Sequence, residues 1–368
     1  MSHTHEQEEA LRRGLGLSRR QVLAATTGVA AAASLPLAQP AAAASRRPLV
    51  PPNRRGIILY TVRDAISRDP LSTTLPSGFR RVFEALSGYG YRQVEFAGYR
   101  QHANAEGGAD LETVEGARLL RRWLDDNGLR AEGNHGFIPS SWPLTTADRD
   151  RFIQVLEIAN ILGLDHVGTG NDPTSSAYKD DWDVAADKWN HLGELARGAG
   201  IKLYTHNHDA AYAFLLDRGP LDEQGRPTRS SGIRRLEYFF EISDPRRVHF
   251  EMDIFWAYVA QFKHRTYTAY DGSVRTDVFD PLATVRARES RFPLFHAKDG
   301  TSNPAAANGY DMVPFGTGDI DYRRFFDKLR DRNFHNPMYE QDNAPGTDPA
   351  QSLQYAELSY RNMAALRG

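Results

Sequence analysis

The fold is decided by the stretch Val248–Asp253, which reads "VHFEMD". Side chains alternate along a β-strand, so its three apolar residues share one face and its three polar residues share the other. The apolar face suits packing against helices, and the polar face would then point into the interior of a barrel. Asp253 would lie at the carboxyl end of this strand, at the barrel mouth.

Seven more short runs read as strands, separated by helical patterns or long connections. They are Gly56–Arg63, Gln93–Ala97, Leu129–His135, His166–Gly170, Ile201–His206, Phe292–Lys298 and Met338–Asp342. Helical spacing of apolar residues occurs in Phe79–Tyr89, Glu115–Asn127, Arg149–Leu162, Val184–Arg197 and Ala350–Ala365. The first four of these helices end near a Gly or Asn, as helix C-terminal capping predicts.

Eight strand-and-connection units predict an α/β protein with a single (β/α)₈ TIM barrel. The competing architecture is a doubly wound sheet, which would carry a Gly-rich phosphate loop after its first strand. The stretch after the first strand, "YTVRDAISRDP", has no such loop. Two connections, Leu215–Gly232 and Tyr258–Asp280, are long for a minimal barrel and are expected to form lids or rim loops.

The N-terminal segment reads as a targeting signal. Arg19 and Arg20 precede an Ala-rich, weakly apolar run that ends in small residues near 42–44. The run is too short and alanine-rich for a membrane anchor, and the alternative is an amphipathic helix. We therefore predict a twin-arginine signal peptide over 1–45, a Pro- and Arg-rich linker over 46–55 and the barrel over 56–368. Export would involve the Tat translocon and place the protein in the periplasm or outside the cell, without membrane insertion.

Composition excludes several classes of function. The formal net charge of the 368 residues is −2, without a basic stripe, so nucleic-acid binding is not expected. No cysteine is present, which excludes disulfides, thiolate ligands and thiol nucleophiles. The G-x-S-x-G, Walker and H-E-x-x-H motifs are also absent. Glu132 and Glu194 offer a pair for glycoside hydrolysis, but Glu194 falls on a predicted helix and reads better as a solvated residue.

Polar side chains end four consecutive predicted strands: His206, Asp253, His296 and Glu340. Each alone would read as a structural polar group. Together at one barrel mouth, two imidazoles and two carboxylates predict a site for a divalent metal. Mn²⁺ is the first choice, with Zn²⁺, Co²⁺ or Fe²⁺ as alternatives.

Further residues near the strand ends are candidates for the substrate site. Proton transfer is assigned to Glu340, His135, His208 and Lys298. Substrate binding is assigned to Glu95, Tyr60 and Trp256. Structural hydrogen bonds, ion pairs and core packing are the alternative roles for these side chains.

The chain also resembles the sugar phosphate isomerase/epimerase family of xylose-isomerase-like TIM barrels. The resemblance runs from about residue 56 to 366 and rests on several motifs in order. They are "YTVRD", "VEFAGY", a His ending the third strand, "HNHD", "MDIFW", "FHAKD" and "YEQD". It implies a divalent metal held by strands five to eight, and sugar, inosose-like or keto-sugar substrates. Many members move a proton at a carbon beside a metal-polarised carbonyl, using two glutamates.

One position departs from the better-known epimerases of this family, because His206 stands where they carry a glutamate. The leading prediction is an exported, metal-dependent sugar isomerase or epimerase acting on a keto-sugar or polyol. The first alternative is a 3-keto-glycoside lyase or hydrolase in the same pocket, where an oxidised C3 acidifies the C2 proton. The second is a sugar-binding barrel without catalysis. A small-molecule sugar or glycoside is the expected partner in each case, and a homo-oligomer is compatible with all three.

Overall fold

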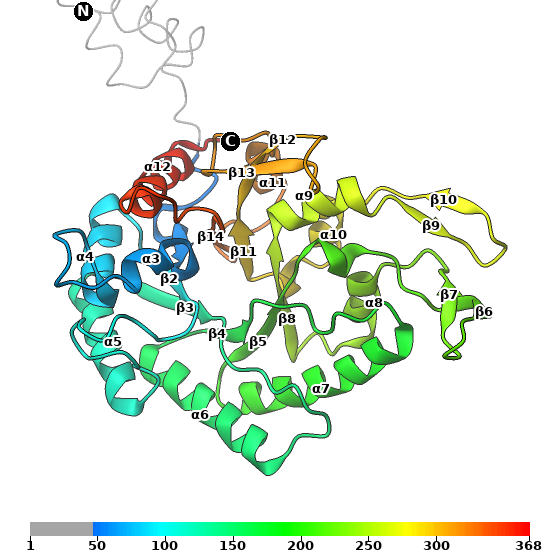
Figure 1. The fold of residues 1–368 in the computed structure, drawn as a ribbon, viewed down its shortest axis with the longest axis horizontal. Coiled ribbons are helices and arrows are strands. Elements are labelled where there is room, and N and C mark those ends of the chain that lie inside the picture. The colour runs from blue at the N-terminus through cyan, green and yellow to red at the C-terminus, as the bar shows by residue number, and fades with distance from the viewer. Residues whose placement is uncertain (1–46) are drawn as a thin grey trace, which may run out of the picture. The chain divides into compact units, whose positions relative to one another are not determined.

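The computed structural model describes residues 47–368, and the predicted signal peptide lies outside them. Eight parallel strands form the main sheet, in the order β3-β2-β1-β14-β11-β8-β5-β4 (Figure 1). The outermost strands β3 and β4 approach each other through a bridge between His135 and Gly168, and Gly136 N donates to Gly168 O at 2.9 Å. The sheet is therefore a nearly closed barrel, and the predicted TIM-barrel fold is confirmed.

The strands begin and end close to the predicted positions. Their bounds are β1 Gly56–Ile58, β2 Gln93–Phe96, β3 Arg130–Asn134, β4 His166–Thr169, β5 Lys202–His206, β8 Val248–Asp253, β11 Leu294–Ala297 and β14 Asn336–Tyr339. The largest difference is in the first strand, which was expected to extend to Arg63. The chain instead turns after Ile58 into the 3₁₀ turn Leu59–Val62 and the short helix α3 (Arg63–Ile66).

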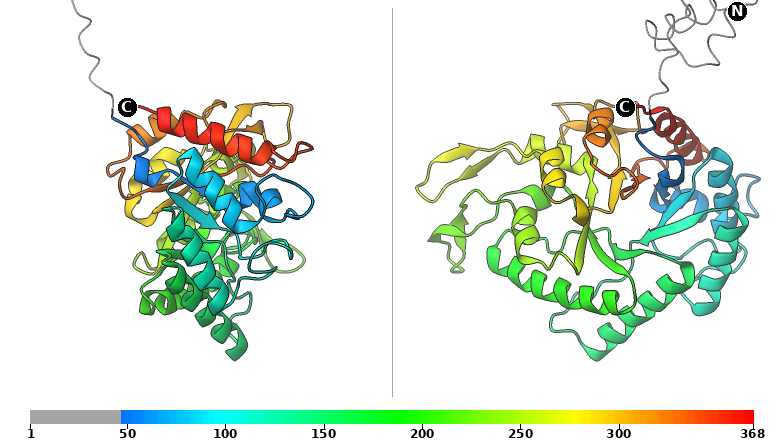
Figure 2. Two further views of the ribbon diagram at one scale, coloured as in Figure 1. Left: turned by 90° about the vertical axis from the view of Figure 1, so that its left-hand side faces the viewer. Right: turned by 180° about the vertical axis from the view of Figure 1, so that it is seen from behind.

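Helices surround the strands (Figures 1 and 2). The remaining ones are α4 Gly78–Tyr89, α5 Val114–Asp126, α6 Thr146–Leu162, α7 Lys179–Gly198, α8 Arg235–Ile242, α9 Ile254–Lys263, α10 Pro281–Ala287, α11 Tyr322–Asp327 and α12 Gln351–Ala365. Further 3₁₀ turns span Pro52–Arg54, Asp209–Tyr212 and Glu289–Arg291. None of the helices in the described part of the chain is long and apolar enough to cross a membrane.

The two long connections contain β-hairpins at the rim of the barrel. One pairs β6 (Arg218–Leu221) with β7 (Pro227–Arg229), and the other pairs β9 (Thr266–Thr268) with β10 (Val274–Thr276). Both hairpins project from the same side of the molecule (Figures 1 and 2). A third hairpin, β12 (Asp299–Ser302) with β13 (Tyr310–Val313), follows β11.

The described part of the predicted linker packs onto the barrel. Leu49 and Val50 are buried, and Leu49 N donates to Leu366 O at 3.1 Å. Gly368 N donates to Arg47 O at 3.1 Å, so the first and last described residues lie side by side.

The large apolar core includes many residues of the strands and of the helices around them. A separate small apolar cluster consists of Tyr204, Leu294 and Met338. Several polar strand residues are also fully or almost fully buried. They include Gln93, Glu95, Glu132, His206, Glu251, Asp253, His296 and Asn336. TIM-barrel interiors usually consist of bulky branched apolar side chains, so this barrel devotes part of its interior to a polar site.

Candidate metal centre

The four predicted metal ligands come together at the carboxyl ends of consecutive strands. His206 ends β5, Asp253 ends β8, His296 lies in β11 and Glu340 follows β14. One donor atom from each lies within 4.8 Å of the other three, and all four side chains are buried. Asp253 Oδ2 lies 3.4 Å from His206 Nε2 and 3.8 Å from His296 Nδ1. We call these four residues the outer cluster.

The donor atoms of the outer cluster suit a cation. His206 Nε2, His296 Nδ1, Asp253 Oδ2 and Glu340 Oε2 are buried and have no hydrogen-bond partner of good geometry among the described residues. These atoms contact one another and Lys298 in ion pairs, and side chains grouped in this way could hold a metal ion. Two imidazole nitrogens and two carboxylate oxygens fit Mn²⁺, Fe²⁺, Co²⁺ or Zn²⁺.

Lys298 lies against the carboxylates of the outer cluster. Its Nζ is 2.8 Å from Asp253 Oδ2 and 2.7 Å from Glu340 Oε2. It also donates to both carboxylate oxygens of Asp342, at 3.0 and 3.1 Å. Burial alone would lower the pKa of Lys298, but the three carboxylates outweigh it and raise that pKa. Lys298 is therefore a fixed cation at the edge of the site, and Asp342 can hold it while the other two carboxylates contact an ion.

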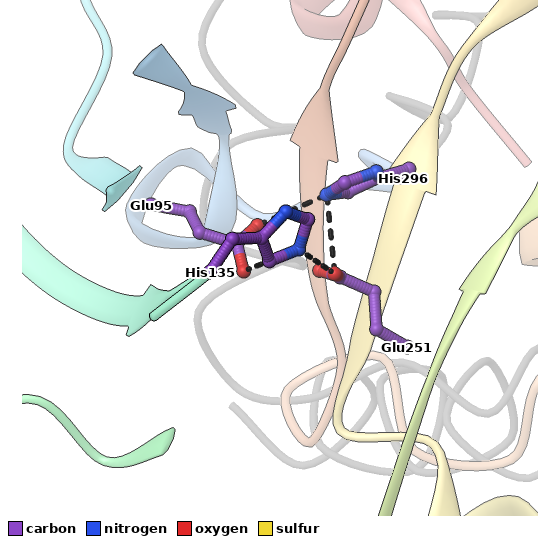
Figure 3. A group of neighbouring side chains, drawn as sticks. All are labelled: Glu95, His135, Glu251 and His296. Carbon is purple, nitrogen blue, oxygen red and sulfur yellow. Dashed lines mark hydrogen bonds and ion pairs between the residues drawn. The ribbon is translucent and has the colours of Figure 1, made fainter. Parts of the chain in front are cut away.

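A second group of side chains contacts the outer cluster through His296. Glu95, His135, Glu251 and His296 point toward one another in Figure 3, and one donor atom of each lies within 4.8 Å of the others. His296 takes part in both groups through different nitrogens, with Nδ1 facing Glu340 at 2.7 Å and Nε2 facing Glu95 at 3.1 Å. We call these four residues the inner cluster.

Sequence reasoning did not assign Glu251 to the site. Its position could have been found, because Glu251 lies two residues before Asp253 and so on the same face of β8. Burial raises the pKa of Glu251 to about 7. Burial also lowers the pKa of His135, to about 4, so that ring is neutral at pH 7.

A cavity of about 570 Å³ opens above the two clusters. Six of the predicted site residues line it: Tyr60, His135, His206, His208, Lys298 and Glu340. The side chain of Glu95 is fully buried, and its carboxylate contacts His135 and His296 rather than the cavity. The Trp256 ring lies 5.5 Å from the His208 ring, with Lys298 Nζ 5.6 Å from its centre. Neither Glu95 nor Trp256 is among the residues that line the cavity.

The "HNHD" turn positions the mouth of the site. Asn207 Oδ1 accepts from Asp253 N at 3.3 Å, which ties the end of β5 to the end of β8. Asp209 contacts Lys263 Nζ at 2.8 Å and His264 Nε2 at 3.0 Å, at the C-terminal end of α9. His208 N donates to Asp172 Oδ1 at 3.0 Å, and the His208 ring faces the cavity.

Comparison with known proteins identifies the family of the chain. The model of the family described as xylose isomerase-like TIM barrel matches residues 83–357, about three quarters of the chain. The chain belongs to the xylose isomerase-like TIM barrel family. No curated protein sequence matches it.

Solved structures of the same fold have low sequence identity to this chain. A sugar phosphate isomerase/epimerase from Parabacteroides distasonis is 21% identical with a TM-score of 0.59, over 85% of this chain and 94% of that one. A probable 3-DHS dehydratase from Bacillus anthracis is 14% identical with a TM-score of 0.54, over 84% of this chain and 97% of that one. A xylose isomerase domain protein from Planctomyces limnophilus is 15% identical with a TM-score of 0.53, over 85% and 96%. These likenesses show the fold.

Proposed function

We propose that this protein is a divalent-metal-dependent enzyme that transfers a proton at a carbon beside the carbonyl of a keto-sugar or polyol. The observation that carries the proposal is the outer cluster. Two imidazole nitrogens and two carboxylate oxygens, all buried, come within 4.8 Å of one another at the carboxyl ends of the strands, where TIM-barrel enzymes build their active sites. A cavity of about 570 Å³ above them has room for a sugar.

A bound ion would polarise a substrate carbonyl and make the adjacent C–H bond acidic. The chain supplies groups that can take up and return the proton. Glu340 and His208 both line the cavity. Lys298 brings a positive charge to the same wall and can orient a substrate oxygen. We assign proton transfer to Glu340 and His208 and substrate orientation to Lys298, with His135 at the cavity edge.

One observation favours elimination from a 3-keto-glycoside as the second candidate reaction. A cavity of about 480 Å³ is lined by Ser140, Trp142 and Pro173 among others. The same two loops line the main cavity, through Gly136 and Asn171. A neighbouring cavity of this kind can hold the aglycone that leaves from C1 of the 3-keto-glycoside. The B. anthracis protein of similar fold is a probable 3-DHS dehydratase, and dehydration is also an elimination.

Solvent-deuterium NMR distinguishes these reactions. The purified protein is loaded with Mn²⁺ and incubated in D₂O with ketoses, inososes and 3-keto-glucosides. Deuterium in a ketose or inosose, lost in Glu340→Gln, supports the isomerase or epimerase. Release of the aglycone from 3-keto-glucosides alone supports the lyase or hydrolase. Tight sugar binding with no deuterium at any carbon and no released aglycone contradicts both and leaves a sugar-binding barrel.

We also propose that the protein is exported by the Tat pathway, on the basis of Arg19, Arg20 and the Ala-rich run that follows them. Cell fractionation of the full chain and of an Arg19→Lys/Arg20→Lys variant tests this. The proposal predicts periplasmic or secreted protein for the full chain and cytoplasmic protein for the variant. Identical distributions would contradict it.

A further inference from the structure

We propose that the inner cluster is a second cation site, which binds Zn²⁺ or a similar tetrahedral ion through Glu95, His135, Glu251 and His296. The proposal concerns binding alone and does not depend on which reaction the protein catalyses.

The ring nitrogens and carboxylate oxygens of the inner cluster lie slightly closer together than the ligand atoms of a four-coordinate ion. A tetrahedral Zn²⁺ bound at about 2.0–2.2 Å holds neighbouring ligand atoms about 3.3–3.6 Å apart. His135 Nε2 lies 3.5 Å from Glu95 Oε1 and 2.9 Å from Glu251 Oε2. His296 Nε2 lies 3.1 Å from Glu95 Oε2 and 3.2 Å from Glu251 Oε2. Three of these four distances are shorter than the separations expected around Zn²⁺, so the ligand atoms would have to move apart by a few tenths of an ångström to take up an ion.

Charge also favours a cation here. Glu95 and Glu251 are both fully buried, and neither carboxylate forms an ion pair with a Lys or Arg among the described residues. Two carboxylates without a permanent counter-charge are costly in a protein interior. The outer cluster differs, because Lys298 already offsets part of its charge. A divalent ion would balance the two carboxylates of the inner cluster.

One atom of the inner cluster has no protein partner at all. Glu251 Oε1 is buried and accepts no hydrogen bond from the described part of the chain. By contrast, Glu95 Oε1, which lies 3.5 Å from His135 Nε2, also accepts from the Tyr204 hydroxyl, and this hydrogen bond fixes the carboxylate. A carboxylate held in place by a hydrogen bond from a neighbouring side chain is a common supporting arrangement at metal sites.

The two clusters can be filled together because they use opposite nitrogens of His296. Nδ1 faces Asp253 and Glu340, and Nε2 faces Glu95 and Glu251. With both sites filled, one ring nitrogen of His296 would face each ion. The inner ion would fix the His135 and His296 rings, and so connect the cavity wall to the outer cluster.

Zinc stoichiometry tests the proposal. The full chain is stripped with a chelator and reloaded with Zn²⁺ alone. Bound zinc is then counted by mass spectrometry and located by anomalous diffraction. We expect two ions per chain, one beside Asp253 and one beside Glu251. Glu251→Gln keeps the side-chain shape and should leave only the ion beside Asp253, and Asp253→Asn should leave only the ion beside Glu251.

Glu132→Gln is the matched control, because Glu132 is also a fully buried strand carboxylate but hydrogen-bonds Gln93 Nε2 at 2.6 Å outside both clusters. It should retain two ions, and circular dichroism checks that each variant is folded. A single ion beside Asp253 in the parent protein, or two ions in Glu251→Gln, would overturn the second site and leave the proposed function standing. No bound ion at all would overturn both.

Discussion

Asp253 has two separate contacts through its two carboxylate oxygens. Oδ2 faces the outer cluster, and Oδ1 accepts from Trp256 N at 2.9 Å, which caps the N-terminus of α9. A ligand that is also a helix cap is held in place before any ion binds. The strand-end pattern identified Asp253 as a ligand candidate, but the cap could not be foreseen because α9 itself was not predicted.

Substituting Asp253 by Asn should keep the helix cap and weaken the contact with the ion. Asn caps helices about as well as Asp, so Asp253→Asn should fold with α9 intact. The substitution removes the charge that faces the ion, and we therefore expect the Mn²⁺ affinity to fall at least about 100-fold. Loss of a residue that only hydrogen-bonds a metal ligand usually lowers the affinity by less than this. Calorimetric titration with Mn²⁺ and thermal unfolding measure the two effects.

Asp253→Ala provides the comparison for this variant. It loses both contacts and should be less stable than Asp253→Asn by about 1 kcal/mol, the usual value of a helix cap. If the Asn variant binds Mn²⁺ as tightly as the parent protein, Asp253 is not a ligand.

At the scale of elements, the helix ends show how local sequence and packing combine. Gly90 ends α4 with φ of 111°, and a Cβ added there would lie 2.4 Å from the Tyr360 ring of α12. Gly128 follows α5 with φ of 60°, and a Cβ there would meet no atom within 4 Å. The sequence predicts both helix ends, but only the structure shows that Gly90 also permits close packing of two helices.

We expect different costs for alanine at these two glycines. Gly128→Ala should lower the free energy of unfolding by about 1–2 kcal/mol, from the positive φ alone. Gly90→Ala should lose a further 1–3 kcal/mol, approximately, because the methyl group collides with the Tyr360 ring. Urea denaturation of both variants measures the difference, and equal losses would mean that α12 moves away without cost.

Arg234 holds the two long rim connections together. Its guanidinium is buried and donates to Tyr212 O at 2.7 Å, His264 O at 2.9 Å and Asp277 O at 2.6 Å. His264 and Asp277 belong to the second connection and Tyr212 to the turn after β5, and Arg234 itself follows directly after the first connection. The hairpins are therefore tied to the barrel at one point.

Replacing Arg234 should loosen both connections. Arg234→Met leaves three carbonyls without their donor, and we expect a loss of about 3 kcal/mol, since hydrogen bonds from a charged donor are worth more than neutral ones. Hydrogen exchange should speed up in both β6–β7 and β9–β10. Arg218→Met, on an exposed side chain of β6, is the control. Unchanged hydrogen exchange in β9–β10 would show that Arg234 supports only the connection that contains β6–β7.

These connections also mark where sequence prediction stopped. Long amphipathic helices and apolar strands carry a periodic pattern, so five helices and all eight barrel strands were predicted within a few residues. The helices α8, α10 and α11 are short, α9 is nearly all apolar, and the hairpins are exposed. Such short, uniformly apolar or exposed stretches give only a weak periodic pattern of apolar and polar residues, and this pattern is what predicts a helix or strand from sequence.

At the scale of the whole molecule, buried histidines make stability depend on pH. Burial lowers the pKa of His166 from 6.5 to about 3, and its Nδ1 lies 3.0 Å from Glu132 O. Between these pKa values the unfolded chain binds a proton that the folded chain does not. The stability that His166 contributes is therefore complete above pH 6.5 and is lost as pH falls toward 3.

The pH dependence can be assigned with one substitution. From pH 7 to pH 5, His166 alone should lower the free energy of unfolding by about 2 kcal/mol. In His166→Gln the fall over this range should be smaller by that amount, whereas His191→Gln, on an exposed helix position, should behave like the parent protein. Denaturant unfolding at the two pH values measures this, and an identical pH dependence in all three proteins would refute the assignment.

The outer cluster was predicted from sequence because each member ends a strand and parallel strands end at one edge. The inner cluster was not, because Glu95 and His135 were considered one at a time and Glu251 lies one layer deeper. Their proximity depends on the stagger of neighbouring strands, such as the pairing of His206 with Glu251. A single sequence does not specify that register.

The polar interior of this barrel has a consequence for protein engineering. Selection for heat resistance usually favours apolar side chains at buried positions, and Glu95, Glu251 and Asp253 are among the most buried residues of the chain. Replacing them would strengthen the core and remove the candidate ligands in the same step. Stabilising substitutions should therefore be sought on the outer helices and hairpins, where thermostability can be raised without competing with the centre.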